Sequence, residues 1–312
     1  MKRFFRKLGD MLINGAAHLP LGVLYVFSDF CYFLLFYVFR YRRKVAEKNL
    51  RESFPEAGDD EINGILKKFY RNFTDYTVET LKLAHISDEE MMRRMTFEGT
   101  ELMDDAVAAG RSVVVYFSHC FNWEWAPSVT LHSRFKDDKN VIFAQVYRPL
   151  KSEWFDGVML RLRSRFGSES FKKSTVLRDL LKLRMEKKVW VTGFMSDQKP
   201  SHGDPTYIVK FLNHPTAAIT GTETLAMRLK TTAIYWDMQK ISRGHYNIVM
   251  RKIADDASTM QKNEVTQKYV ELLENTIRRQ PDIWLWTHKR WKIPVKFPEQ
   301  SPENETDSSN NT

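Results

Sequence analysis

Five apolar segments with strand-forming composition mostly alternate with helical segments along the chain. The predicted strands are 112–117, 140–147, 188–194, 231–238 and 246–253. The helices predicted around them are 101–110, 153–166, 174–187, a loop and helix in 211–230, and 263–281. Such alternation places helices over both faces of a largely parallel sheet. The predicted fold class is therefore α/β, with a largely parallel sheet flanked by helices.

Composition limits the class of protein and its partners. The chain has 312 residues, of which 43% are hydrophobic, which suits one large domain with a real core. Lys and Arg number 48 against 39 Asp and Glu, so the net charge of +9 indicates an acidic partner. The basic residues are spread along the chain without a nucleic-acid motif, so no nucleic-acid partner is predicted. Cys31 and Cys120 form neither a disulfide framework nor a zinc motif, and no metal or cofactor is predicted.

An apolar run near the N-terminus, "LPLGVLYVFSDFCYFLLFYVF", covers 19–39. As a helix it would be about 30 Å long, the thickness of a bilayer core. Asp29 favours a buried core helix, since a charge in lipid is expensive. Aromatic and basic residues at both ends favour a membrane anchor, which we predict for residues 1–43. Basic clusters on both sides leave open whether the segment crosses the bilayer or enters one leaflet.

A histidine and a glutamate follow the first long predicted strand, in "VVVYFSHCFNWEW" (113–125). Ligands of such sheets collect beyond the carboxyl ends of the strands. If Asn122 caps a helix, Glu124 lies in its first turn and faces His119. The carboxylate would then orient the imidazole as a general base for a substrate hydroxyl, in acyl or phosphoryl transfer. In the simpler interpretation His119 does no chemistry and Glu124 only stabilises its helix terminus. Cys120 should face the other way and be a small buried residue.

The "SHCFNWEW" segment resembles the HX4(D/E) motif of membrane acyltransferases, and especially the late acyltransferases of lipid A biosynthesis. Further blocks similar to this family follow in the same order and cover most of 20–297. They are "RRKVAEKNLRESFPE" (42–56), "VYRPL" (146–150), "SDQKP" (196–200), "TAAITGTETLAMRLKTTAIYW" (216–236) and "YVELLENTIRRQPDIWLWTHKRWK" (269–292). The sequence departs from the family where Phe121 replaces a glycine and where Thr222 and Glu223 replace small residues.

The resemblance implies a glycerolipid-acyltransferase-like fold and a reaction. An acyl chain passes from acyl-carrier protein to a hydroxyl of a hydroxyacyl chain on a lipid A precursor, with His119 as base and Glu124 orienting it. The resemblance also implies that the protein is bound to the inner membrane and contacts its lipids, with the catalytic domain (44–298) on the cytoplasmic face. The polar tail 299–312 is predicted to be disordered. Open alternatives are acylation of a lysophospholipid or other glycolipid, thioester hydrolysis, and a non-catalytic basic membrane-binding protein.

Further polar residues are candidates for substrate binding, each with a structural alternative. Arg148 follows a predicted strand and suits an oxyanion or a phosphate, but it could also pair with Asp156. The other candidates are Asn122, Asp197, Gln198, Arg161 (on a helix that also carries Arg163 and Arg165) and Arg290 (among tryptophans near the C-terminus). The alternatives are a turn-forming aspartate at 197, a solvated charged face on the helix, and core tryptophans beside solvated cations.

Overall fold

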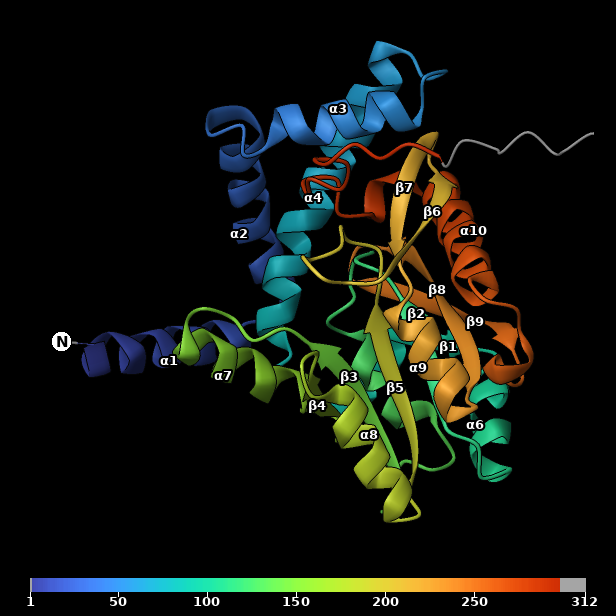
Figure 1. Cartoon of the computed structure of the whole chain (residues 1–312). Helices are drawn as coiled ribbons and strands as arrows, with labels where there is room; N and C mark the ends of the chain where they lie inside the picture. Colours follow the sequence, from blue (N-terminus) through green and yellow to red (C-terminus); the bar gives the residue numbers. More distant parts are fainter. Residues whose placement is uncertain (1, 298–312) are drawn as a thin grey trace, which may run out of the picture.

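A seven-stranded sheet forms the centre of the computed structural model, which describes residues 2–297 (Figure 1). The spatial order is β1-β9-β8-β2-β5-β3-β4, and every neighbouring pair is parallel except β8 and β9. The strands are β1 (Met95–Glu98), β2 (Val113–Phe117), β3 (Val141–Tyr147), β4 (Glu169–Lys172), β5 (Val189–Met195), β8 (Thr232–Ser242) and β9 (His245–Ala254). The predicted α/β class with a largely parallel sheet is confirmed. The predicted tail at 299–312 lies outside the described residues.

Four strands were not predicted, for identifiable physical reasons. β1 and β4 have four residues each and lie at the two edges of the sheet, where little apolar alternation is needed. β6 (Thr206–Phe211) and β7 (His214–Ile219) form a separate antiparallel hairpin. Its two-residue turn has positive φ at Leu212 (48°) and Asn213 (65°). The Leu-Asn pair is not the Asn-Gly sequence that usually signals such a turn.

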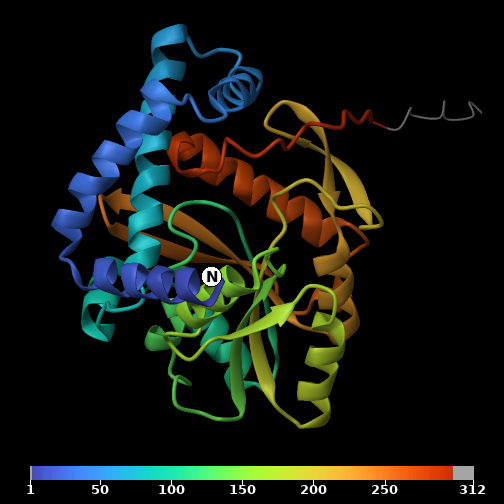
Figure 2. The same cartoon turned by 90° about the vertical axis from the view of Figure 1, so that its left-hand side faces the viewer.

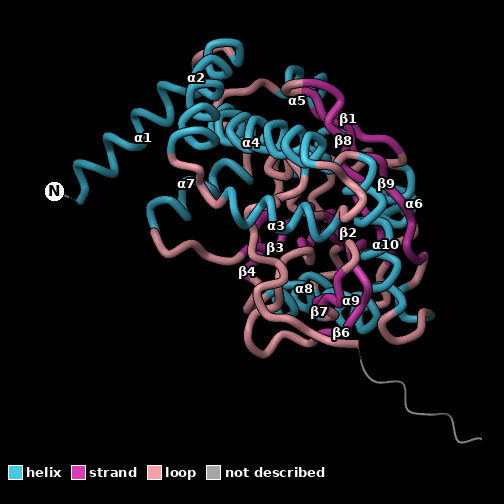
Figure 3. The backbone as a smooth tube through the Cα atoms, turned by 90° about the horizontal axis from the view of Figure 1, so that it is seen from above, coloured by secondary structure: helices cyan, strands magenta, loops and turns pink. Residues whose placement is uncertain are grey.

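Helices pack around the sheet, and the N-terminal helices form a separate group. Those attached to the sheet are α5 (Asp88–Arg94), α6 (Glu101–Ala108), α7 (Glu153–Arg163), α8 (Val176–Met185), α9 (Gly221–Leu229) and α10 (Glu264–Arg279). The N-terminal helices are α1 (Lys2–His18), α2 (Leu21–Phe33), α3 (Arg43–Ser53) and α4 (Asp59–Lys82). Helix α4 runs beside α2, and Figures 2 and 3 show α1, α2 and α4 gathered on the same side of the molecule. All five helices predicted around the strands occur at nearly the expected positions, with α9 as the helix in 211–230, whereas the loop predicted before it contains β7.

The apolar run forms α2 and a wider π-helical turn, Leu34–Val38. Within residues 2–297, Leu21–Val38 is the one helical stretch long and apolar enough to cross a membrane. One of its faces packs against α4 and shares the hydrophobic core of the molecule. The predicted anchor segment (1–43) therefore contacts the catalytic domain directly, and its boundary with 44–298 stays a prediction.

Candidate active site

His119 lies just beyond the carboxyl end of β2, where it meets Asp197, which follows the neighbouring strand β5. The imidazole Nδ1 is 2.7 Å from Asp197 Oδ1, and the backbone amide of His119 donates to Asp197 Oδ2 at 3.0 Å. The indole of Trp284 donates a third hydrogen bond to Asp197 Oδ2 at 2.9 Å. Because β2 and β5 are parallel neighbours, their ends bring together two side chains that are 78 residues apart in the sequence.

The electrostatics of this pair favour one protonation state. Burial of Asp197 opposes its charged form, but the His119 ring and the three hydrogen bonds outweigh burial and lower the pKa of Asp197 to about 2. The ionised carboxylate accepts from Nδ1–H of His119, which leaves the lone pair on Nε2. No hydrogen-bond partner of Nε2 occurs in the part of the chain that the structure describes. His119 lines a cavity, so Nε2 can take a proton from a molecule bound there.

Glu124 does not contact His119, contrary to the expected pairing. The guanidinium of Arg163 on α7 donates two hydrogen bonds to Glu124, at 2.6 and 2.8 Å, and Trp123 Nε1 donates a third at 3.2 Å. Asn122 Oδ1 accepts from the amide of Glu124, as a capping residue does, but the chain continues as a turn and a 3₁₀ helix (Ala126–His132). This turn directs Glu124 towards α7. The geometric prediction is wrong, whereas a role of Glu124 in catalysis stays a prediction.

The cavity beside His119 has a volume of about 610 Å³ and is open to solvent. Arg148 and Gln198 line it, as expected of substrate-binding residues, and Arg148 is exposed at the end of β3. Further lining cations are Arg163, Lys173, Lys199 and Arg228, opposed by the carboxylate of Asp204. The apolar lining includes Val176 and Leu177 of α8, Phe194 of β5 and Leu225 of α9. The cavity thus combines a cationic rim with an apolar wall.

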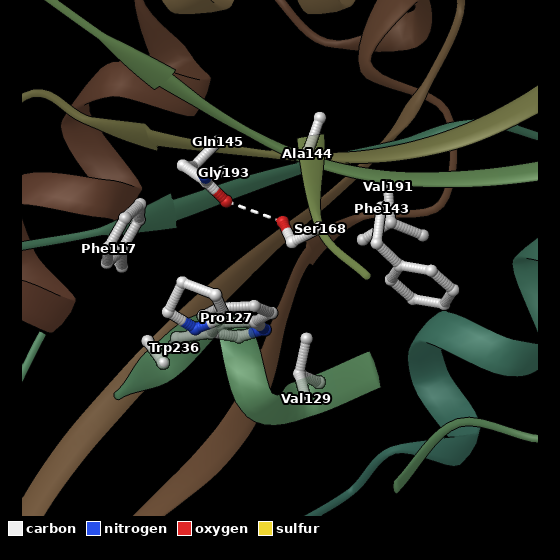
Figure 4. A pocket seen from close by; sticks show the side chains of 11 residues that line it. Phe117, Pro127, Val129, Phe143, Ala144, Gln145, Ser168, Val191, Gly193 and Trp236 are labelled. Carbon is white, nitrogen blue, oxygen red and sulfur yellow. Dashed lines mark hydrogen bonds between the residues drawn. The ribbon is translucent and has the colours of Figure 1, made fainter. Parts of the chain in front are cut away.

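A second cavity, lined mostly by apolar side chains, adjoins the first. Its volume is about 20 Å³, room for roughly one water molecule. Phe117, Phe143 and Trp236 contribute to its lining (Figure 4), and Gln145 is a lining residue of both cavities. The side chain of Gln145 is held by the hydroxyls of Ser168 and Ser170, so a hydrogen-bonded amide separates the two spaces.

Three residues predicted to bind substrate lie elsewhere. Asn122 is buried, and its amide donates to the Glu79 carboxylate on α4. Arg161 is exposed and pairs with Asp10 of α1 at 3.3 Å, on the border of another cavity. Arg290 is buried and donates to the Ala217 carbonyl of β7, and burial lowers its pKa to about 10. These three residues do not line the His119 cavity, and substrate binding by Asn122, Arg161 and Arg290 stays a prediction.

Two residues of the site were not predicted as such. Arg163 was recognised only as one of three arginines on its helix, because the sequence does not show which of them faces the cavity. Trp284 was not singled out among the C-terminal tryptophans, and it is buried, where its indole donates to Asp197. Cys120 is fully buried, as predicted, and burial raises the pKa of its thiol, which excludes a ready thiolate nucleophile.

Comparison with known proteins identifies the family of the chain. The family model for bacterial lipid A biosynthesis acyltransferases matches residues 2–293. The chain is 23% identical over 253 residues to the lipid A biosynthesis palmitoleoyltransferase of Escherichia coli (strain K12), over 80% of this chain and 79% of that protein. The lipid A biosynthesis acyltransferase of Shigella flexneri matches to the same extent. Since the family model spans nearly the whole sequence, the chain belongs to the bacterial lipid A biosynthesis acyltransferase family.

Proposed function

We propose that the protein transfers an acyl chain from the thioester of acyl-carrier protein to a hydroxyl of a hydroxyacyl chain on a lipid A precursor. The observation that carries the proposal is the His119–Asp197 pair beside a cavity with a cationic rim and an apolar wall. A hydroxyl needs a base, a phosphorylated glycolipid needs cations, and an acyl chain needs an apolar surface. This cavity offers all three within a chain of the lipid A acyltransferase family.

The proposed step is direct transfer. Nε2 of His119 takes the proton of the acceptor hydroxyl while the hydroxyl oxygen attacks the thioester carbonyl. The tetrahedral intermediate collapses when the carbon–sulfur bond breaks, and the leaving thiolate takes the proton from His119. Asp197 holds the imidazole and stabilises its positive charge during the step. A Cys120 acyl-enzyme is not part of the scheme, because that thiol is fully buried.

Substrate binding is assigned to the rim and the wall. Arg148 is exposed at the rim, where water screens its charge, so it suits an acceptor phosphate better than a transition-state oxyanion. The backbone amides of Glu124 and Trp125 both donate to Asn122, so neither is assigned to the oxyanion. Leu177, Phe194 and neighbouring apolar side chains are assigned to the acyl chain.

The proposed location is the cytoplasmic face of the inner membrane. Acyl-carrier protein is a cytoplasmic donor, and Leu21–Val38 supplies an apolar helix for membrane contact. The two cysteines are both free, which fits a reducing compartment.

Acyl transfer by the purified full-length chain tests the proposal. Acyl-carrier-protein thioester and a lipid A precursor are mixed in detergent micelles, and products are identified by mass spectrometry. The precursor should gain one acyl group with the native chain and far less with His119→Ala. Transfer to a lysophospholipid alone, release of free fatty acid alone, or transfer that does not depend on His119 would contradict the proposal.

A further inference from the structure

The outward face of α2 is an exposed apolar surface. Residues at helical spacing form this outward stripe: Val23, Val26, Phe27, Phe30 and Phe33. Val26 is 72% exposed, and the stripe continues past the π-helical turn to Val38 and Phe39. A row of large exposed hydrophobic side chains of this length is unusual on a soluble protein and indicates a contact surface.

The inward face of the same helix makes polar contacts with the catalytic domain. Tyr25 donates to Glu79 at 2.9 Å, and the fully buried Ser28 donates to Asp75 at 2.7 Å, both on α4. Arg243 lies in the turn between β8 and β9. Its guanidinium pairs with Asp29 and with Asp75, each at 2.7 Å.

These polar contacts are incompatible with a helix that crosses the bilayer. Asp29 is the ninth of the 18 residues in Leu21–Val38, so crossing would place it near the bilayer centre. If the contacts stayed intact, Asp75, Arg243 and the charged helix α4 would follow it into hydrocarbon. If they broke, buried carboxylates would lose their partners. Either outcome carries a large free-energy cost.

We propose that α2 lies along one leaflet of the membrane, with the outward stripe among the lipid chains and the inward contacts intact. Both ends of the helix then stay on the side of the catalytic domain. Basic residues flank the helix in the sequence: Arg40, Arg42 and Arg43 follow the apolar stretch directly, and Arg6 and Lys7 lie on the preceding helix α1. These side chains would meet anionic headgroups. This surface is independent of the acyl-transfer proposal and does not depend on the substrate.

Two glycines flank the apolar stretch and allow a direct topology test. A Cβ added at Gly15 in α1 or at Gly58 before α4 meets no atom within 4 Å, so cysteine should be tolerated at both. Each is introduced into the full-length chain carrying Cys31→Ser, and that chain without an added cysteine serves as the blank. A membrane-impermeant maleimide is applied to inverted and to right-side-out vesicles, and labelling after detergent solubilisation shows that each thiol reacts.

Both added cysteines should label in inverted vesicles, and neither should label in right-side-out vesicles until solubilised. Labelling of the two positions from opposite sides would show a crossing helix and overturn the proposal.

A second measurement tests the outward stripe. Flotation with vesicles of phosphatidylcholine and phosphatidylglycerol should show several-fold weaker binding for Val26→Asp than for the native chain. Met185→Asp is the matched control, because Met185 is 79% exposed on α8, away from α2. Equal vesicle binding by the two variants would contradict the assigned contact surface.

Discussion

Asp197→Asn is the sharpest test of how the candidate base is positioned. Asp197 accepts three hydrogen bonds, two from His119 and one from Trp284. Asparagine keeps the size of the side chain, but it loses the charge and replaces one acceptor oxygen with an NH₂ donor. The imidazole then loses the partner that fixes Nδ1–H and supports its positive charge. In a Ser-His-Asp site the same exchange lowers kcat by about 10⁴, because the wrong tautomer forms.

We therefore expect turnover to fall by about 10²–10⁴, which corresponds to about 3–5 kcal/mol of transition-state stabilisation. Initial rates of acyl transfer with saturating donor and acceptor measure the effect. Asp137→Asn, the same exchange at an exposed residue before β3, is the control and should leave the rate unchanged.

The same substitution has a calculable effect on stability. The pKa of Asp197 falls from 3.8 to about 2 in the folded protein, so the unfolded chain binds more protons between these values. The carboxylate thus contributes stability above pH 3.8 that is lost as the pH falls towards 2. The lowering of this pKa corresponds to about 2 kcal/mol of stability. Urea unfolding in detergent should show that loss at pH 7 in Asp197→Asn, with a weaker pH dependence below pH 4.

The result that would refute the assignment is specific. If Asp197→Asn transfers acyl chains at a near-native rate while Glu124→Gln abolishes transfer, then Asp197 does not position His119. The predicted order of effects is the reverse for turnover, because Glu124 contacts Arg163 and not the imidazole.

Further predictions concern single residues. His119→Ala should lower turnover by about 10²–10⁴, whereas Cys120→Ser should be mild; the opposite order in initial rates would reject direct transfer. Arg148→Ala should mainly raise the KM for the acceptor, and Arg148→Lys should restore only part of it; a large fall in kcat at unchanged KM would assign Arg148 to the oxyanion. Burial lowers the pKa of His288 to about 4, so folded stability should fall as the pH drops from 6.5 to 4. Unfolding midpoints should depend less on pH in His288→Gln.

The sequence alone predicted that the main candidate site residues lie at the same edge of the sheet. His119, Arg148 and Asp197 each follow an apolar, β-branched strand, and the carboxyl ends of parallel strands share one edge. The strand segments are long and uniform enough for periodicity to identify them. The short edge strands and the Leu-Asn hairpin turn lack such a signal, and they were missed.

Only the tertiary structure determines which carboxylate holds His119. Glu124 is five residues away and Asp197 is 78, so sequence proximity favoured Glu124. The order of β2 and β5 brings Asp197 within 2.7 Å, while the turn after His119 directs Glu124 to Arg163. Strand order depends on contacts among distant segments, which no local pattern of residues contains.

The sequence predicts the helices, but the tertiary structure decides which way their side chains point. Arg161 and Arg163 are two residues apart, so their side chains leave α7 on nearly opposite sides. Only the packing of α7 decides that Arg163 reaches the cavity. For α2, the composition of the apolar run determined that it is a helix suited to lipid. The contacts with α4 and Arg243 decide which face of α2 points outward. A polar side chain in an apolar helix turns towards a hydrogen-bonding or charged partner, because burying it without one is costly.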